Sequence, residues 1–430
     1  MIAQFRAPKD NTLLEHLLMG RRLTLPLFVA TLVSTWYGGI FGVASIAFES
    51  GIYNFITQGV FWYVAYLIFA FFILKKIHKY QAMTLPDLIG KMFGPRSEKV
   101  SAFFNVLNLV PVAYAISMGL IVQMFFPVTL NEGILIGVGF TLLYAMFGGF
   151  RAVVFSDLAQ FFIMFSSVVG LFLFSVFLFG ARPLESLPSS YFEPMGGHGV
   201  LETLVWGFIA LSTLVDPNFY QRAFAANSPS TAKWGIVVAT ILWMIFDLSL
   251  TFGAMYAKAL LPLAEAKDGY FEFAFKVLPQ GFRGYFLAGI AATVLSTLDS
   301  YLFLAGSTLA YDLAPKRYRG QVWLHYMSFL FIAAVSILMA TMFEGDIKAV
   351  WKTLGSLSAA SLLFPVLYGY LSKRKLSDNT FVTSAITSAI IVISWRLFGF
   401  KDVTGIDELY VGVAVSLIVI TGRQIYGIKR

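Results

Sequence analysis

The stretch STWYGGIFG, residues 34–42, lies inside an apolar segment that is long enough to span a membrane, yet it contains two adjacent glycines. Each glycine weakens a helix by about 1 kcal/mol relative to alanine. A second apolar segment is interrupted at STLVDPNFY, residues 212–220, where Pro217 removes a backbone donor and clashes with the preceding turn. In lipid, the freed backbone groups are tolerated only where protein or a water-filled cavity satisfies them. We therefore predict two helices that are broken near their middles.

The composition of the chain is that of a membrane protein. Its 430 residues are 58% hydrophobic and 13% charged, whereas soluble domains contain about 25% charged residues. About twelve apolar segments each reach the roughly 17–25 residues that a membrane-spanning helix needs. These segments are residues 23–47, 53–74, 101–126, 132–149, 152–180, 199–224, 233–261, 284–313, 322–343, 348–372, 380–398 and 407–426. We predict an all-α polytopic membrane protein with about twelve transmembrane helices, of which helices 1 and 6 are broken.

Basic residues are distributed unevenly between the loops. Most of the 31 Lys and Arg residues lie in the N-terminal segment 1–22 and in every second loop, including KKIHK (75–79), KRYR (316–319) and KRK (373–375). Because cytoplasmic loops carry an excess of Lys and Arg, this pattern places both termini in the cytoplasm of a cell-membrane protein. The net charge of +8 is then a topology signal. We expect the lipid bilayer as surroundings, no nucleic-acid partner and no obligate protein partner.

The two interruptions occupy corresponding positions in two halves of the chain. They lie five segments apart, so that the first segment runs outward and the sixth runs inward. Antisymmetric interruptions are typical of inverted-repeat transporters, whose solute and ion sites lie at the breaks. Glycine and proline that only serve close helix packing are the alternative. We predict a 5+5 inverted-repeat core, with repeats at 23–180 and 199–372, and two peripheral helices within 379–426.

A polar stripe runs along the eighth segment, in the sequence AATVLSTLDS at 291–300. Its hydroxyl residues, which share one helix face at i, i+3, i+4 and i+7, are Thr293, Ser296, Thr297 and Ser300. Hard monovalent cations prefer oxygen ligands, and a broken helix supplies free carbonyl oxygens. A stripe that faces the break in the first helix would therefore form an oxygen cage for a cation. The alternative is that these hydroxyls only bond across helices or to their own backbone.

Three carboxylates lie inside the apolar segments away from their ends and from the two breaks, at Asp157, Asp247 and Asp299. Each costs about 2.5–3.5 kcal/mol at the centre of a membrane helix, so each needs a partner. Arg222 is expected near the inner membrane boundary, and a bound metal ion is an alternative counter-charge. For Asp247 we expect only hydrogen bonds, to the Ser249 hydroxyl, to a hydroxyl such as that of Ser34 or to a neighbouring helix, and we assign it no functional role.

Five motifs follow one another along the chain. They are GRRLTLPLFVATLVSTWYGG (20–39), MTLPDLIGKMFG (83–94), GGFRAVVFSDLAQ (148–160), DPNFYQRAFAANS (216–228) and AATVLSTLDS (291–300). Each motif is loose, but in their order and spacing they resemble the sodium:solute symporter family. The resemblance implies the LeuT-type inverted-repeat fold and the symport of a solute with sodium.

The resemblance also implies where sodium binds. The family's shared site uses carbonyls of the first core helix and a carbonyl and two hydroxyls of the eighth, which fall here on Ser34, Tyr37, Thr293, Ser296 and Thr297. A second site, present in some members, falls on Asp157, Asp299 and Ser300. Position 299 is a carboxylate here, not a hydroxyl, so this site could hold sodium or a shared proton, because close carboxylates resist double ionisation. We therefore expect one or two transported sodium ions.

By the same resemblance, a small organic solute is expected between the broken helices 1 and 6 and helices 3, 8 and 10. The candidate solute-binding residues at the two breaks are Trp36, Tyr37, Gly38, Asp216 and Asn218. The pair Trp36 and Tyr37 resembles the choline-transporting branch, where aromatic rings attract quaternary ammonium, but that branch has tryptophan at the position of Asn218. An organic cation, an amino acid, a sugar and a monocarboxylate all remain open.

These expectations favour a sodium-coupled secondary active symporter that imports a small organic solute by alternating access. A proton-coupled transporter of the same fold is the alternative. A channel or a membrane sensor fits less well, because neither requires antisymmetric breaks. We expect no enzyme, since the four histidines are scattered without metal-ligand spacing and no nucleophile motif is present.

Overall fold

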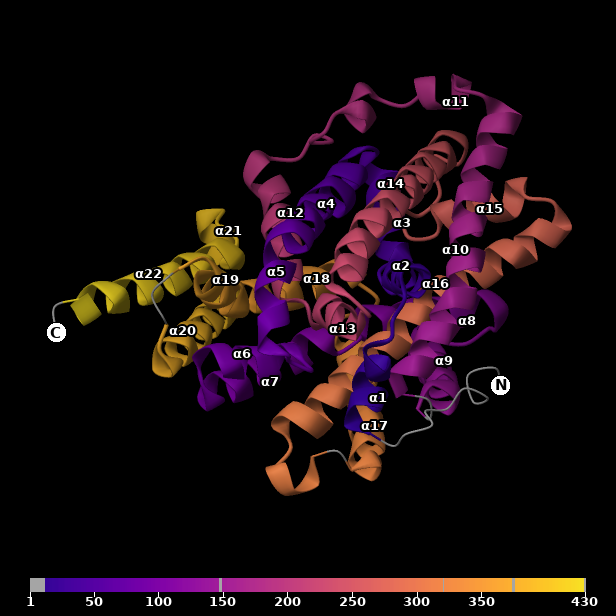
Figure 1. Ribbon diagram of the computed structural model, residues 1–430. Helices are drawn as coiled ribbons and strands as arrows, with labels where there is room; N and C mark the ends of the chain where they lie inside the picture. Colours follow the sequence, from indigo (N-terminus) through magenta and orange to yellow (C-terminus); the bar gives the residue numbers. More distant parts are fainter. Residues whose placement is uncertain (1–11, 147–148, 320, 373–375, 429–430) are drawn as a thin grey trace.

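The computed structural model describes residues 12–146, 149–319, 321–372 and 376–428. Of the expected N-terminal segment, residues 1–11 lie outside these ranges, as does the basic loop at 373–375. Apart from one isolated bridge between Leu23 and Ala226, all regular structure in the described ranges is helical (Figure 1). The prediction of an all-α protein is therefore confirmed.

Most helices in the first half of the chain overlap the expected apolar segments. The helices of this half are α1 (Leu13–Leu18), α2 (Leu25–Ser34), α3 (Ile40–Ser50), α4 (Phe61–Ile68), α5 (Leu74–Ile77), α6 (Leu85–Phe93), α7 (Pro95–Leu109), α8 (Val112–Phe125), α9 (Leu130–Ala145) and α10 (Gly149–Phe179). Of these, α1 and α6 lie outside the expected segments. Helices α4 and α5 belong to one longer helical stretch, Phe55–Tyr80, and α7 and α8 belong to another, Pro95–Phe125.

The second half continues in the same way. Its helices are α11 (Arg182–Glu185), α12 (Val200–Leu211), α13 (Pro217–Ala225), α14 (Pro229–Leu260), α15 (Gly269–Val277), α16 (Gln280–Ser307), α17 (Val322–Met342), α18 (Ile347–Ser358), α19 (Phe364–Leu371), α20 (Asp378–Leu397), α21 (Phe400–Thr404) and α22 (Glu408–Ile428).

Nine helical stretches among the described residues are long and apolar enough to cross a membrane. They are Phe55–Tyr80, Pro95–Phe125, Gly149–Phe179, Val200–Ala225, Pro229–Leu260, Gln280–Leu313, Trp323–Met342, Ile347–Leu371 and Asp378–Leu397. Each coincides with an expected segment. The other expected segments, at 23–47, 132–149 and 407–426, are largely helical but do not meet this criterion. The total of about twelve spans therefore stays a prediction.

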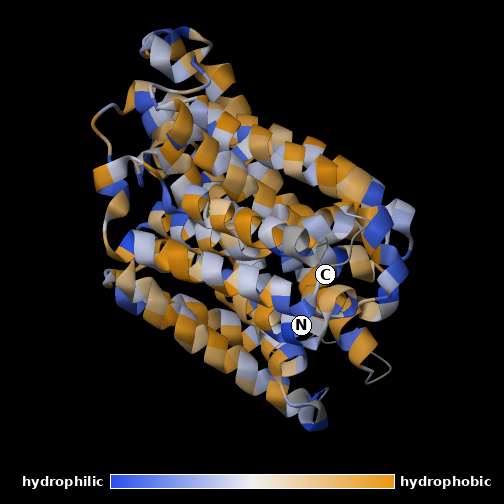
Figure 2. Cartoon of the chain, turned by 90° about the vertical axis from the view of Figure 1, so that its left-hand side faces the viewer, coloured by the Kyte–Doolittle hydropathy of each residue, from blue (hydrophilic) through white to orange (hydrophobic). Residues whose placement is uncertain are grey.

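The surface of the bundle agrees with a membrane location. Figure 2 shows hydrophobic residues along the outer sides of the long helices, with hydrophilic residues gathered mainly at their ends. Large apolar side chains such as Leu143 and Phe177 are 77% and 82% exposed. Extensive exposed apolar surface marks contact with lipid or with another protein, and the length of these helices favours lipid.

Both predicted breaks are present. Helix α2 ends at Ser34 and α3 begins at Ile40, with the adjacent glycines Gly38 and Gly39 between them. Helix α12 passes into a tight turn, Ser212–Val215, before α13 begins at Pro217. Glycine and proline therefore interrupt these helices where the sequence predicts.

The first break lies at the centre of the bundle. Helix α2 packs against α10 and α14, and α10 packs along α16. Helices α20 and α22 pack against each other and against α19 at one edge of the bundle (Figure 1). These two helices occupy the positions of the peripheral pair expected within 379–426.

The end of the bundle that contains α1 is closed. Leu23, just before α2, pairs with Ala226, just after α13. Glu15 of α1 forms ion pairs with Arg151 of α10 and, at 2.6 Å, with Arg22. Burial raises the pKa of the Glu15 carboxyl, but the hydrogen bonds and charges of the two arginines hold this pKa below its ordinary value. The ionised Glu15 carboxylate thus links α10 to the segment before α2, and Leu23 links this segment to the end of α13.

Candidate functional site

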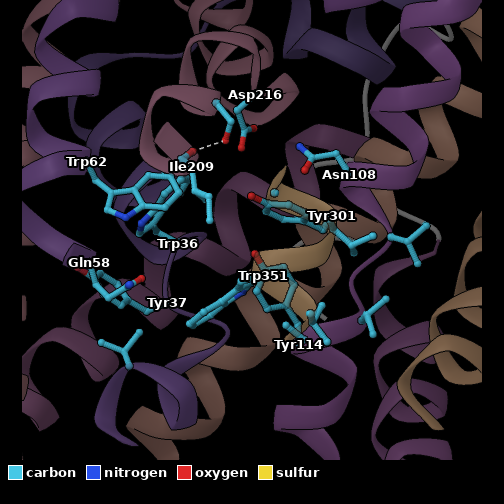
Figure 3. Close-up of a pocket in the computed structure, with 18 of the residues that line it drawn as sticks. Trp36, Tyr37, Gln58, Trp62, Asn108, Tyr114, Ile209, Asp216, Tyr301 and Trp351 are labelled. Atoms are coloured by element: carbon cyan, nitrogen blue, oxygen red, sulfur yellow. Dashed lines mark hydrogen bonds between the residues drawn. The ribbon is translucent and has the colours of Figure 1, made fainter. Parts of the chain in front are cut away.

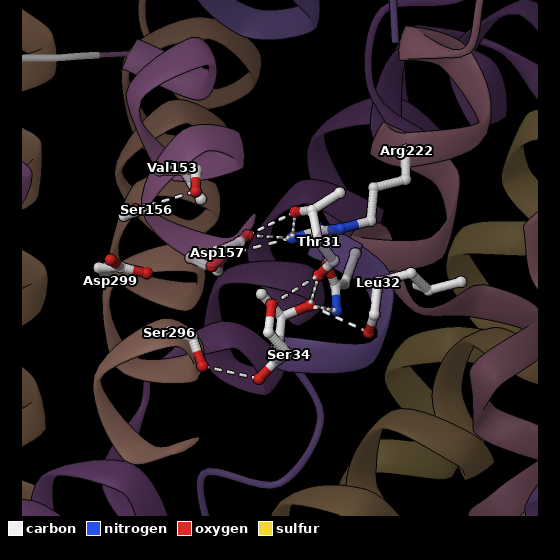
Figure 4. Close-up of polar contacts among 12 residues, drawn as sticks. Thr31, Leu32, Ser34, Val153, Ser156, Asp157, Arg222, Ser296 and Asp299 are labelled. Atoms are coloured by element: carbon white, nitrogen blue, oxygen red, sulfur yellow. Dashed lines mark hydrogen bonds and ion pairs between the residues drawn. The ribbon is translucent and has the colours of Figure 1, made fainter. Parts of the chain in front are cut away.

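A first cluster of oxygen atoms lies where α2 ends and faces the middle of α16. The backbone oxygen of Ser34 accepts hydrogen bonds from the Ser296 hydroxyl at 2.7 Å and from the Thr297 hydroxyl at 3.5 Å. The same two hydroxyls lie 3.1 and 3.0 Å from the backbone oxygen of Thr293. All four residues are completely buried, and Figure 4 shows Ser296 directed at Ser34. Two carbonyl and two hydroxyl oxygens thus converge, a set that suits a sodium ion.

Tyr37, the fifth residue expected at the sodium site, lies in the segment between α2 and α3. Its side-chain hydroxyl donates a hydrogen bond to Asp247 of α14, and the Tyr63 hydroxyl donates to the other oxygen of that carboxylate. The expected bond to a neighbouring helix is therefore formed, from Tyr63 of α4. The alternative bond from Ser249 is not, because residues two positions apart on a helix do not face each other. Ser249 instead bonds the backbone oxygen of Ile245 at 2.7 Å.

A second cluster surrounds Arg222, whose side chain is completely buried. Its guanidinium lies 3.6 Å from the Asp157 carboxylate and 2.9 Å from the Thr31 hydroxyl, which itself donates to Asp157. It also donates to Ser300 at 3.3 Å and to the side-chain oxygen of Asn218. The depth of Arg222 in the membrane stays a prediction. Its guanidinium is completely covered by protein and faces Asp157 and Thr31, so it is an internal counter-charge (Figure 4).

Asp299 lies on α16, beside this second cluster (Figure 4). Its Oδ2 atom accepts a hydrogen bond from the Tyr144 hydroxyl at 3.0 Å. Its Oδ1 atom, like the Oδ1 atom of Asp157, is buried and accepts no hydrogen bond of ordinary geometry from the described residues. Since a buried carboxylate oxygen needs a partner, these two atoms are available to a cation or a proton.

A cavity of about 120 Å³ borders both breaks (Figure 3). Its aromatic lining consists of Trp36, Tyr37, Trp62, Tyr114, Trp206, Tyr301 and Trp351. Its polar lining consists of Gln58, Asn108, Ser212 and Asp216. The remaining lining is aliphatic, apart from Gly355. The cavity therefore combines large ring surfaces with a few polar groups, as solute sites usually do.

Three of the five residues expected to bind the solute line this cavity, namely Trp36, Tyr37 and Asp216. Gly38 does not line it: a Cβ atom at this position would lie 2.6 Å from the Cβ atom of Thr297, so the glycine lets the break approach α16. Asn218 is completely buried, and its side chain accepts from Arg222. Asn218 thus belongs to the second cluster.

The sequence alone does not single out the other aromatic residues of the cavity. These residues are Trp62 of α4, Tyr114 of α8, Trp206 of α12, Tyr301 of α16 and Trp351 of α18. Each lies in an apolar helix, where an aromatic side chain is ordinary packing. The usable signal is the expected contribution of helices 3, 6, 8 and 10, which correspond here to α8, α12, α16 and α18; it leaves out Trp62 of α4.

An all-helical membrane bundle in which two broken helices meet an oxygen cluster and a solute-sized cavity defines a secondary transporter. The profile of the sodium:solute symporter family matches residues 16–375, and the chain belongs to this family. It is a multi-pass membrane protein that couples sodium to the symport of a small solute.

Known relatives and a solved structure agree with this assignment. The high-affinity proline transporter PutP of Bacillus subtilis (strain 168) is 21% identical over 366 residues, which cover 78% of this chain and 75% of that protein. The high-affinity choline transporter 1 of Drosophila melanogaster is 22% identical over 429 residues, covering 92% and 67%. A substrate-bound, outward-open Na+-coupled sialic acid symporter has a TM-score of 0.77 at 16% identity, covering 98% of this chain and 93% of that one. This last likeness shows the fold and confirms the predicted LeuT-type architecture.

Proposed function

We propose that the chain imports a small organic solute together with sodium by alternating access. One observation carries this proposal: the Ser34 and Thr293 backbone oxygens converge with the Ser296 and Thr297 hydroxyls close to the break that borders the cavity. Carbonyl and hydroxyl oxygens at a broken helix are the ligands that sodium uses in transporters of this kind. The backbone oxygen of Tyr37 is the fifth ligand that we propose.

Sodium at this site would tie the end of α2 to the middle of α16. Sodium would bind most tightly when α2 and α16 are held together in this way. It would therefore shift the protein toward the state in which the cavity beside the break can receive solute. One sodium ion that moves down about 100 mV and a tenfold gradient supplies about 3.7 kcal/mol. This free energy supports roughly 500-fold accumulation of an uncharged solute.

We further propose that the closed end at α1 is the inner gate. Both termini are then cytoplasmic, the two inverted repeats occupy 23–180 and 199–372, and the peripheral pair lies within 379–426. Release of solute requires that the contacts of Glu15 with Arg22 and Arg151 break when one repeat rocks against the other. The excess of Lys and Arg in the corresponding loops supports this orientation.

For the second cluster we propose a second transported cation, sodium or a proton, between Asp157 and Asp299. Arg222 balances one of these two carboxylates, so one negative charge remains. The unpartnered Oδ1 atoms of both residues supply ligands, and the Ser300 hydroxyl is close to the guanidinium of the same cluster. A buried carboxylate without a counter-charge is costly, so the remaining negative charge favours a bound cation between Asp157 and Asp299.

The change Asp299→Asn tests this second site. We expect the Hill coefficient of sodium activation to fall from about 2 to about 1, because the number of coupled sites limits this coefficient. The measurement is solute uptake into proteoliposomes at varied sodium, at mildly acidic and at mildly alkaline pH. A proton at the site would instead give a pH dependence that the variant loses. Unchanged sodium and pH dependence would contradict any cation there.

The proposed function is tested by uptake into proteoliposomes under an inward sodium gradient, an inward proton gradient or no gradient. Labelled proline, choline, glucose and lactate represent the four solute classes that the sequence leaves open. We expect saturable accumulation of at least one of them with sodium, and its loss when potassium replaces sodium. Accumulation with protons alone would favour the proton-coupled alternative, and a non-saturating flux without any gradient would favour a channel.

A further inference from the structure

We propose that the solute is a small organic ammonium ion, held between the aromatic rings of the cavity and the carboxylate of Asp216. This proposal rests on the proposed symport function and names the class of solute for its site. Three observations carry it: the ring surfaces that line the cavity, the sign of its one charge, and the groups that cover the helix N-termini at the two breaks.

Indole rings form much of the cavity wall. They belong to Trp36 in the first break and to Trp62, Trp206 and Trp351 on three separate helices. The face of an aromatic ring attracts a cation that lies within about 6 Å of its centroid. Trp36 stands nearly perpendicular to Trp62, with ring planes at 73° and centroids 5.0 Å apart. The rings therefore meet as angled walls, which suit a rounded methylated ammonium group.

The charge of the cavity is negative. Among the described residues that line it there is no Lys, Arg or His, and Asp216 is the one carboxylate. Its Oδ1 atom accepts from the backbone N–H of Asn218 at 2.7 Å and so caps α13. The residue remains 7% exposed, and Figure 3 shows the carboxylate at the cavity wall. The nearby positive charge of Arg222 acts on this carboxylate from outside the lining, so a cation in the cavity would be its one positive partner on the cavity side.

Neither helix N-terminus at the breaks is free to hold an anionic solute. Such termini bind solute carboxylates in transporters with broken helices, because their N–H groups and dipole favour negative charge. The N-terminus of α13 is already capped by Asp216. At the N-terminus of α3, the Trp351 ring packs so closely on Gly39 that a Cβ atom there would overlap it. A carboxylate on the solute therefore finds no positive partner.

The volume of the cavity limits the size of the cation. At about 120 Å³, the cavity is somewhat smaller than an engineered cavity of about 150 Å³ that holds benzene. Tetramethylammonium and choline, with about five to seven non-hydrogen atoms, match this scale. The side chains of Gln58, Asn108 and Ser212 offer hydrogen-bond partners for a hydroxyl group on such a cation.

Binding can be measured by the tryptophan fluorescence of the purified full-length protein in sodium chloride. The probes are choline, tetramethylammonium and 3,3-dimethylbutan-1-ol, which has the shape of choline without its charge. We expect both cations to change the fluorescence saturably. The neutral alcohol should bind at least about tenfold more weakly, since it lacks the attraction of a cation to the rings and to the carboxylate.

Two variants identify the groups responsible. Asp216→Asn, which keeps a good helix cap, and Trp62→Leu are each expected to weaken choline binding by at least about tenfold. Trp62→Phe should keep part of the affinity, because a ring face remains. The control is Asp402→Asn, which removes an exposed carboxylate outside the cavity lining and should bind choline like the wild type.

Sodium binding is followed separately, as the rise in Tm when sodium chloride replaces potassium chloride. No response to either ammonium ion, stronger binding of lactate or glucose, or wild-type choline affinity in both Asp216→Asn and Trp62→Leu would overturn the ammonium proposal. Each of these results leaves sodium symport in place if sodium still raises the Tm. If sodium neither raises the Tm nor drives uptake of any solute tested, the proposed function itself fails.

Discussion

Replacing Ser296 and Thr297 together by alanine is expected to abolish sodium-dependent uptake. Both hydroxyls contact the backbone oxygen of Ser34, at 2.7 and 3.5 Å, and the double variant loses both. A polar contact to a charged group contributes about 1.5–3 kcal/mol, which is roughly 10- to 100-fold in affinity. Loss of two proposed ligands should therefore weaken sodium binding by more than about 100-fold.

Sodium activation of uptake measures this effect, and the sodium-induced rise in Tm measures binding without transport. The matched control is Thr240→Ala with Ser249→Ala, because these buried hydroxyls bond the backbone of their own helix, α14, at 2.8 and 2.7 Å. Thr297→Ser keeps the hydroxyl and should keep the sodium dependence. Wild-type sodium affinity in the Ser296→Ala, Thr297→Ala protein would show that sodium binds elsewhere.

The fold could be predicted because its determinants are local. The glycine pair after Tyr37 and the proline at 217 interrupt their helices in the structure as in the sequence, since each acts on its own helical turn. The long helices follow apolar runs whose length is set by the thickness of the bilayer. The total number of spans depends on short and split segments, such as 23–47 and 132–149, for which length is a weak guide.

The sodium cluster could be predicted in part. Helical spacing places Ser296 and Thr297 on one face of α16, but only the family resemblance indicates that Ser34 lies opposite. The complete burial of Arg222 could not be predicted, because hydropathy gives the end of a segment and not what covers that end. In the structure Gln221, the residue before it, bonds the backbone oxygen of Leu17 at 3.1 Å, so that α1 lies over this end of α13.

The lining of the cavity was beyond sequence reasoning for a different reason. Trp62, Trp206 and Trp351 lie far apart along the chain, and each is an unremarkable residue of an apolar helix. Only the packing of α4, α12 and α18 around the breaks brings their rings to one space. The class of solute proposed above therefore depends on the structure, whereas the ion that drives transport is already indicated by the sequence.

Arg222→Gln is expected to lower the free energy of unfolding by about 3–5 kcal/mol, the usual cost of removing one partner from a buried ion pair. The guanidinium lies 3.6 Å from Asp157, and both side chains are completely buried. Without Arg222, the Asp157 carboxylate keeps the Thr31 hydroxyl as a donor but loses its counter-charge. The Tm of the purified protein in potassium chloride measures the effect without a contribution from bound sodium.

Adding Asp157→Asn to Arg222→Gln should restore most of this stability, because the uncompensated charge disappears with its partner. Lys267→Gln is the control: Lys267 and Glu265 pair at 3.0 Å with side chains that are 59% and 73% exposed, and exposed pairs contribute only up to about 1 kcal/mol. If Arg222→Gln alone were as stable as the wild type, the guanidinium would not be the counter-charge of Asp157. Two monovalent cations, protons or sodium ions, would then be needed to neutralise Asp157 and Asp299.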